Sequence, residues 1–88
     1  MSVKGSSQTI EQVLTNIKKW DRLEVNGDGP YDVMNVERSN GITVMLNTPN
    51  GLAYVRADKI GSNYENLTYV SSNGIQDVMM MKPYYETP

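Results

Sequence analysis

Apolar residues near the start of the chain recur at the spacing of one face of a helix. They occupy positions i, i+3, i+4 and i+7 and are Ile10, Val13, Leu14 and Ile17. Thr9, followed three residues later by Gln12, fits a capping box, in which two side chains satisfy the free backbone donors of a helix start. Because Trp20 continues the apolar stripe, the pattern predicts an amphipathic helix over residues 9–20 that packs on a sheet.

After residue 20 apolar and polar residues alternate, which is typical of β-strands. The dipeptide Asn-Gly, a strong signal for a hairpin turn, occurs four times. The runs between these turns predict strands at residues 22–26, 31–38, 42–47, 52–57, 67–71 and 75–81. No helical periodicity separates the runs, so we expect an antiparallel meander. The methionines at 79–81 would point to alternate faces of the last strand, which predicts that both faces are covered.

The apolar residues also predict how the second and third strands pair. A three-residue loop at 39–41 places Val36 opposite Val44 and Met34 opposite Leu46. A two-residue turn would instead pair apolar with polar residues. We therefore predict the three-residue loop, because the buried face of a sheet sets its register.

The next hairpin and one irregularity follow from the same argument. A loop at 49–51 would place Leu46 beside Tyr54, with proline presetting the backbone of the first turn residue. Val33 and Met34 are adjacent apolar residues in a run that otherwise alternates. Such a break in alternation predicts a bulge or sharp bend at this point.

The order of these segments resembles the opening of the SH3-like small β-barrels. Residues 21–25, a glycine-rich loop, residues 31–37, a tight turn and residues 42–46 follow that spacing. The resemblance spans about residues 21–81, is one of spacing, and contains no diagnostic motif. It implies a fold class and a habit of binding, and it names no ligand.

We therefore predict a mainly β fold (α+β by content), a small antiparallel SH3-like barrel or curled meander sheet with one N-terminal amphipathic α-helix. The expected boundaries are a flexible arm at 1–8, a single domain at 9–81 and a C-terminal tail at 82–88. A chain of 88 residues lies near the lower end of the sizes that fold unaided, so its core must be efficient.

The composition narrows the chemistry. Histidine and cysteine are absent, which excludes Ser-His and Cys-His nucleophiles and ordinary zinc sites. The net charge of −2 argues against a nucleic-acid or membrane binder driven by electrostatics. No apolar run approaches the roughly 18 residues of a membrane-spanning helix, and the lack of cysteine is compatible with a cytoplasmic protein.

The acidic residues between 21 and 37 offer two candidate chemistries. Asn26, Asp28, Asp32 and Glu37 have the spacing of calcium ligands, but Tyr31 occupies the position that requires glycine. We prefer to interpret this stretch as an ordinary turn. A carboxylate pair would support a small hydrolytic enzyme only if the surroundings separated the two pKa values. The candidate carboxylates are Asp21, Glu24, Asp28 and Asp32.

The aromatic and basic residues remain as a binding inventory. We expect Tyr54 and Tyr69 in the core. The predicted binding residues, those least needed for the core, are Trp20, Asp28, Tyr31, Arg38, Arg56, Lys59 and Tyr64. We expect a non-catalytic adaptor or accessory module that recognises a protein partner or self-associates, with no cofactor and no metal. The alternative is a single-stranded nucleic-acid binder that uses tyrosines and arginines, and a hydrolytic enzyme is the third hypothesis.

Overall fold

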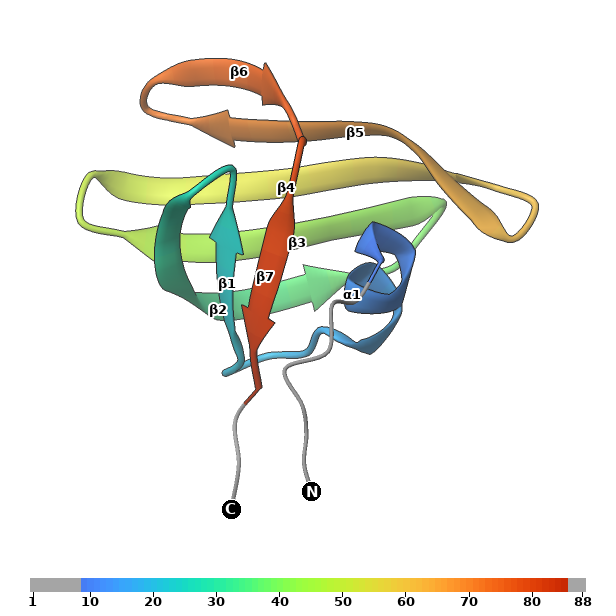
Figure 1. The fold of residues 1–88 in the computed structure, drawn as a ribbon, viewed down its shortest axis with the longest axis horizontal. Helices are drawn as coiled ribbons and strands as arrows, with labels where there is room; N and C mark the ends of the chain where they lie inside the picture. The colour runs from blue at the N-terminus through green and yellow to red at the C-terminus, as the bar shows by residue number, and fades with distance from the viewer. Residues whose placement is uncertain (1–8, 86–88) are drawn as a thin grey trace.

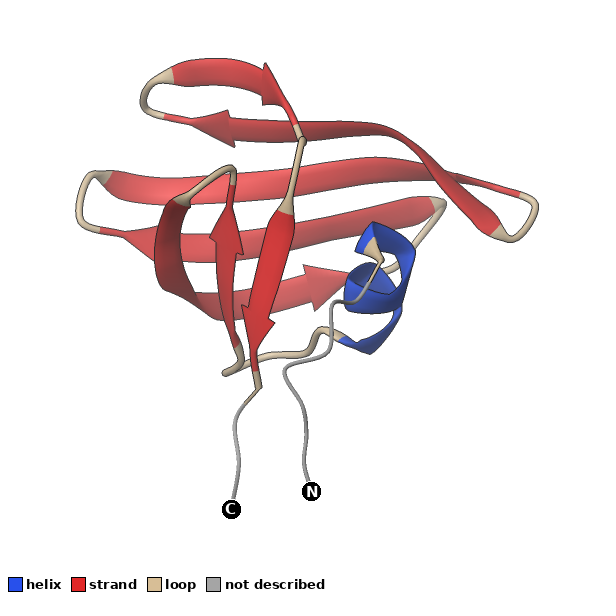
Figure 2. Cartoon of the chain, in the orientation of Figure 1, coloured by secondary structure: helices blue, strands red, loops and turns tan. Residues whose placement is uncertain are grey.

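The computed structural model describes residues 9–85 and consists of one short helix and a curled antiparallel sheet (Figure 1). The fold is mainly β, as the sequence predicts, and strands dominate the chain (Figure 2). The sheet has seven strands in the order β6-β5-β4-β3-β2-β1-β7. The predicted arm at 1–8 and residues 86–88 lie outside the described residues. The elements are α1 (Ile10–Asn16), β1 (Arg22–Val25), β2 (Asp28–Glu37), β3 (Gly41–Thr48), β4 (Gly51–Ile60), β5 (Asn63–Ser71), β6 (Gly74–Asp77) and β7 (Met81–Tyr84).

The core lies inside the curl of this sheet. In Figure 1, β1 and β7 cross in front of β3 and β4, because the sheet bends back over itself at β2. Alternate residues of the strands point inward, α1 adds the buried side chains Val13 and Leu14, and Ile17, directly after the helix, is buried with them. The strand residues that complete the core include Leu23, Val25, Val33, Val44, Leu46, Val55 and Tyr69.

The helix begins as predicted and ends early. The capping box is present, since Gln12 N–H donates to Thr9 Oγ1 at 3.1 Å and Thr9 N–H donates to Gln12 Oε1 at 2.9 Å. The prediction of a helix up to residue 20 is wrong, because the backbone turns extended at Ile17 (ψ 140°). The next N–H group, that of Lys18, donates to the carboxylate of Asp21 at 3.1 Å and so leaves the helical ladder.

The β2–β3 hairpin confirms the predicted loop and bend. Val36 pairs with Val44, and the register shifts between Val33 and Asn35, where we predicted a bulge. The bulge changes one predicted pair, because Leu46 lies opposite Val33 rather than Met34.

The β3–β4 hairpin differs from the prediction by one residue. Its turn has two residues, 49–50, so that Leu46 pairs with Ala53 and not with Tyr54. The hydroxyl of Thr48 closes the turn, because it donates to the carbonyl of Gly51 at 2.7 Å and accepts from the backbone N–H of Asn50 at 3.1 Å. As a consequence, Tyr54 points away from the core and is only half-buried. The expectation that it lies in the core is therefore wrong.

The glycine-rich stretch after β1 is a tight turn rather than a loop. Val25 pairs with Asp28 across Asn26 and Gly27, whose φ angles are 54° and 82°. Two successive positive φ angles are typical of a type I′ turn, which suits the twist of a hairpin. Strand β2 therefore starts three residues earlier than predicted.

The single strand predicted at 75–81 is two strands on opposite edges of the sheet. β6 pairs with β5, and β7 pairs with β1. Between them residues 78–80 cross from one edge to the other, where Met79 is 78% exposed and Met80 is 56% exposed. The expectation that these methionines are covered is wrong for both, although Met81 is buried. Residues 82–84, expected in the tail, belong to β7.

Asn26 holds this crossing segment against the β1–β2 turn. Its Oδ1 accepts the N–H groups of Met79 (2.7 Å) and Met80 (3.2 Å), and its Nδ2 donates to the Asp77 carbonyl (2.9 Å) and to Gln76 Oε1 (3.3 Å). Its backbone N–H donates to the Met80 carbonyl at 3.0 Å. We call these five hydrogen bonds the Asn26 clasp. The clasp fastens the turn of one hairpin to the chain that joins the two sheet edges.

The clasp predicts a stability difference between two left-handed asparagines. Asn26→Gly keeps the positive φ at little cost and removes the side-chain bonds, so we expect unfolding free energy to fall by about 2 kcal/mol. Asn40→Gly is the matched control, because Asn40 has a φ of 61° and makes no side-chain hydrogen bond in the described structure. Urea unfolding of both variants measures the difference, and an equal loss in the two would contradict the clasp.

Candidate functional site

The structure does not gather the predicted binding residues into one site. Asp28 and Tyr31 share a hydrogen bond, and Arg38, Lys59 and Tyr64 line one hollow beside α1. Arg56 lies in a separate hollow on the outside of the sheet. Trp20 is 56% exposed, with the ammonium of Lys19 5.0 Å from its ring centre.

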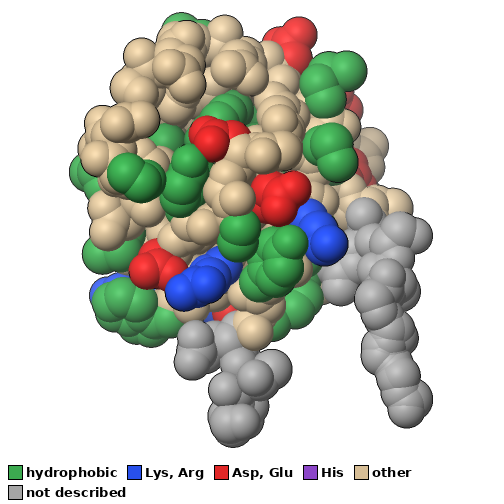
Figure 3. All heavy atoms as spheres, turned by 60° about the vertical axis from the view of Figure 1, so that its left-hand side comes forward, with side chains coloured by type: hydrophobic (Ala, Val, Ile, Leu, Met, Phe, Trp, Pro, Cys, Tyr) green, Lys and Arg blue, Asp and Glu red, His purple; other side chains and the backbone are tan. Residues whose placement is uncertain are grey.

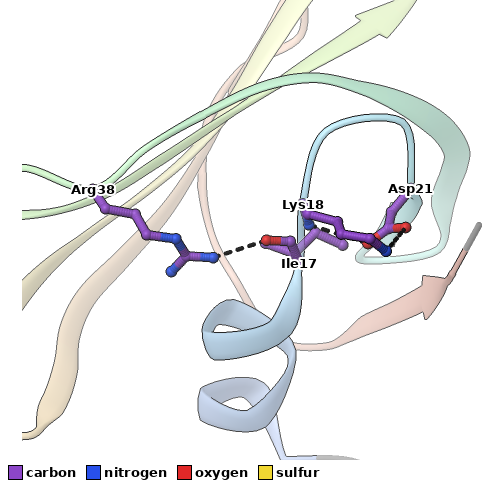
Figure 4. A network of polar contacts seen from close by, with 4 residues as sticks. All are labelled: Ile17, Lys18, Asp21 and Arg38. Atoms are coloured by element: carbon purple, nitrogen blue, oxygen red, sulfur yellow. Dashed lines mark hydrogen bonds and ion pairs between the residues drawn. The ribbon is translucent and has the colours of Figure 1, made fainter.

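Arg38 holds the end of the helix. From the end of β2 its guanidinium reaches the last turn of α1 (Figure 4) and donates to the carbonyls of Leu14 (3.0 Å), Thr15 (3.4 Å) and Ile17 (2.8 Å). Helix C-termini leave carbonyl groups unsatisfied, and a cation placed there also suits the helix dipole. The Arg38 guanidinium is thus engaged in structure and is not free to meet a ligand.

Among the described residues, Asp21 is the charged side chain that is fully buried, with no exposed area. One of its oxygens accepts from the Lys18 ammonium at 3.0 Å, and the other accepts from the Lys18 backbone N–H (Figure 4). Its own backbone carbonyl accepts from Val33 N–H at 2.8 Å, which ties the turn after α1 to β2. From the sequence, Asp21 was predicted only as one of the candidate carboxylates of a hydrolytic enzyme. Its spacing of three residues from Lys18 was the available signal for this structural role.

Lys59 and Tyr64 pair at the far end of the β4–β5 hairpin. The Lys59 ammonium lies 4.7 Å from the ring centre of Tyr64. Tyr64 is only 8% exposed, so the prediction that it belongs to an exposed rim is wrong. Tyr64 belongs to the core cluster that also contains the helix residues Val13 and Leu14, and the Glu11 carboxylate of α1 accepts its backbone N–H at 3.2 Å.

Asp28 is shared by two tyrosines. The hydroxyl of Tyr31 donates to one carboxylate oxygen at 2.6 Å, and the buried Tyr69 donates to the other at 2.8 Å. The pKa of Tyr31 is raised mainly by the hydrogen bond to Asp28 and, to a smaller extent, by burial. The pKa of Tyr69 is raised mainly by burial and, to a smaller extent, by the hydrogen bond to Asp28. Both phenols are therefore donors that keep their protons in mildly alkaline solution.

The calcium-like spacing does not form a site. Asn26 Oδ1 accepts backbone N–H groups of the clasp, and both oxygens of Asp28 accept tyrosine hydroxyls. Asp32 Oδ1 accepts from the Arg22 guanidinium at 3.2 Å. Within residues 9–85 there is also no group of three acidic, histidine or cysteine side chains able to hold a metal ion.

The outside of β3–β6 carries a continuous line of apolar side chains. Met45 pairs with Tyr54, Tyr54 with Val70, and Val70 with Ile75, one residue from each strand. We call these four residues the apolar row. Ile75 is 73% exposed, and the other three are half-buried. Directly paired side chains lie about 5 Å apart on one face of a sheet, so the row forms one surface.

A second line runs beside the apolar row. It crosses five strands through direct pairs, and we call it the polar row; its members are Glu37, Thr43, Arg56, Thr68 and Asp77. The middle of this row and part of the apolar row line an open hollow of about 510 Å³. The two rows together are called the outer face below.

Arg56 differs from every other described cation. Within residues 9–85 the other lysines and arginines each contact a carboxylate, a backbone carbonyl or an aromatic ring. Arg56 makes no such contact, and Asp58, two residues along on the same strand, instead accepts from Asn66 Nδ2 at 2.9 Å. Arg56 is exposed, and its five N–H donors make no hydrogen bond within the described residues, so a partner can accept them in place of water.

The charges near the surface are otherwise mixed. On the side of the molecule drawn in Figure 3, Lys and Arg side chains lie beside Asp and Glu side chains and form no basic stripe. The outer face itself carries Glu37 and Asp77 against Arg56, with Asp58 at its border. Its local charge is therefore acidic.

Comparison with known proteins adds no relative. No family model, no curated protein and no solved structure matches this chain. In the part of the chain that the structure describes, no helix has the length and apolar character needed to cross a membrane.

The Asp28 cluster predicts a pH dependence. Because the folded-state pKa values of Tyr31 and Tyr69 lie above the ordinary value of 10.0, their contribution to stability is fully present below about pH 10. It is lost as the pH rises through the raised values. Absorbance titration at alkaline pH should show that Tyr31 and Tyr69 ionise at a higher pH than an ordinary tyrosine. The substitution Asp28→Asn should return the pKa of Tyr31 toward its ordinary value. Ionisation of all tyrosines in one step near pH 10 would refute this account.

The two arginines should respond differently to the same substitution. Arg38→Met leaves three carbonyls at the end of the helix without this donor, and we expect a loss of about 2 kcal/mol in unfolding free energy. Arg56→Met removes no hydrogen bond or ion pair within the described residues and should stay within about 0.5 kcal/mol of the wild type. Urea unfolding compares them, and the assignment fails if Arg56→Met costs as much as Arg38→Met.

Proposed function

We propose that this chain is a non-catalytic domain that recognises a protein partner through the outer face of β3–β6. The observation that carries the proposal is the apolar row beside the unpartnered Arg56. Contiguous apolar patches rimmed by polar groups mark interaction sites. Tyrosine and arginine are also the residue types that dominate binding energy at protein interfaces, and Tyr54 and Arg56 lie two residues apart on one strand.

The charges of the outer face favour a protein over a nucleic acid. Tyr54 and Arg56 resemble the stacking and cationic elements of a single-strand binder. However, Glu37, Asp58 and Asp77 surround that one arginine, and phosphate groups would be repelled. The nucleic-acid hypothesis therefore ranks second.

The arrangement of the acidic residues also supports a non-catalytic role. Asp21 is tied to Lys18, Asp28 to two tyrosines, and Asp32 to Arg22. Each of these carboxylates has a structural partner, and of the three only Asp32 lines one of the hollows found among the described residues. The SH3-like assignment and the cytoplasmic location stay predictions from the sequence.

The test compares two partly exposed tyrosines on different parts of the sheet. A phage-displayed library of random peptides is selected on the wild type, and the enriched peptides are then measured against Tyr54→Ser and Tyr84→Ser. Loss of the Tyr54 ring should weaken binding about tenfold or more, because buried aromatic anchors dominate interfaces. Tyr84→Ser, on β7, should bind as the wild type does.

Equal binding of the enriched peptides by both tyrosine variants would contradict the proposed face. A single-stranded oligonucleotide, added to the wild type, tests the nucleic-acid hypothesis. Amide shifts at Tyr54 and Arg56 on addition of the oligonucleotide, weakening as salt rises, would replace a protein partner with a nucleic acid.

A further inference from the structure

The polar row presents an ordered pattern of charge. From β2 to β6 its members are acidic, neutral, basic, neutral and acidic, in the order Glu37, Thr43, Arg56, Thr68 and Asp77. None of the three charged side chains has a hydrogen bond or ion pair within the described residues. A partner that complements this row must therefore present basic, acidic and basic groups in that order.

The spacing of the row selects the kind of segment that fits. Neighbouring strands lie about 4.8 Å apart, so successive charges, two strands apart, are separated by about 9.6 Å. A helix rises about 1.5 Å per residue, and residues i, i+7 and i+14 lie on one side at steps of about 10.5 Å. An extended strand repeats the same side every 6.6 Å or so, which does not match.

The apolar row lies where the stripe of such a helix would need it. It runs across β3–β6 directly beside the polar row, and Ile75 and Val70 line the hollow that contains Arg56. A helix that lies across the strands can therefore place apolar residues on one row and charged residues on the other. An amphipathic helix with a heptad-like stripe has this geometry.

We propose that the partner docks on the outer face with an amphipathic helix of about 15 residues whose flank carries a basic, an acidic and a basic residue at heptad spacing. The acidic residue binds Arg56, and the two basic residues lie against Glu37 and Asp77. This inference rests on the proposed function, since it names the partner segment for the same face.

The test uses three designed helical peptides that share one leucine stripe. Their flanking positions i, i+7 and i+14 carry Lys-Glu-Lys, Lys-Lys-Lys or Glu-Lys-Glu. Net charge alone ranks Lys-Lys-Lys first, because the outer face is acidic. The charge pattern ranks Lys-Glu-Lys first, and we expect it to bind about three- to fivefold more tightly than Lys-Lys-Lys, with the preference weakening at high salt.

Two variants that each remove one positive charge test whether the preference for Lys-Glu-Lys depends on Arg56. Arg56→Gln should abolish it, because the glutamate then has no cation to meet. Lys82→Gln, on β7, removes the same charge elsewhere and should leave the preference intact. Equal or tighter binding of Lys-Lys-Lys by the wild type overturns the inference, and so does a preference that survives Arg56→Gln.

Amide shift mapping separates the two levels of the claim. Shifts at Tyr54 and Val70 without any preference among the three peptides would overturn the helix pattern and leave the proposed face standing. If the leucine-striped peptides instead shifted only residues away from β3–β6, the proposed function would fail together with the inference.

Discussion

The hydrogen bonds of Asn26 are the constraint on which the rest of the structure depends. They join the turn between β1 and β2 to the end of β6 and to residues 78–80, the segment that carries the chain from one sheet edge to the other. Each of these bonds is modest by itself, but together they fix where the chain passes from β6 to β7. With this point fixed, β7 can pair with β1, and α1 packs beside β7 and reaches β5 through the Glu11 carboxylate.

This closure uses most of the residues that looked available for binding. Arg38 caps the helix, Tyr64 is covered from the helix side, and Asp28 holds two tyrosines. The face of β3–β6 turned away from the core takes no part in closure. It therefore keeps an arginine without a partner among the described residues, beside a contiguous line of apolar side chains, and an exposed apolar patch of this kind is typical of an interaction surface. The proposed function rests on this division between used and unused side chains.

Sequence patterns such as capping motifs and alternation of apolar residues predicted the parts of the fold that depend on contacts between residues close in sequence or on one buried face. The capping box at Thr9, the pairing of Val36 with Val44 and the bulge after Val33 depend on residues close in sequence, or on one buried face. The clasp joins residues about fifty positions apart, and no periodicity records such a contact. Arg56 of the outer face was among the predicted binding residues, but Tyr54 was expected in the core. The turn closed by the Thr48 hydroxyl is one residue shorter than predicted, which places Tyr54 on the outside.

Amide hydrogen exchange of the wild-type protein tests the closure most directly. Met79 and Met80 have exposed side chains, yet their N–H groups donate to Asn26. The account predicts that these two amides are protected and open together with the paired amides of β1 and β2, as one cooperative unit. Exchange of Met79 and Met80 at the rate of an unstructured peptide would contradict it, because the two sheet edges would then be joined by a free loop.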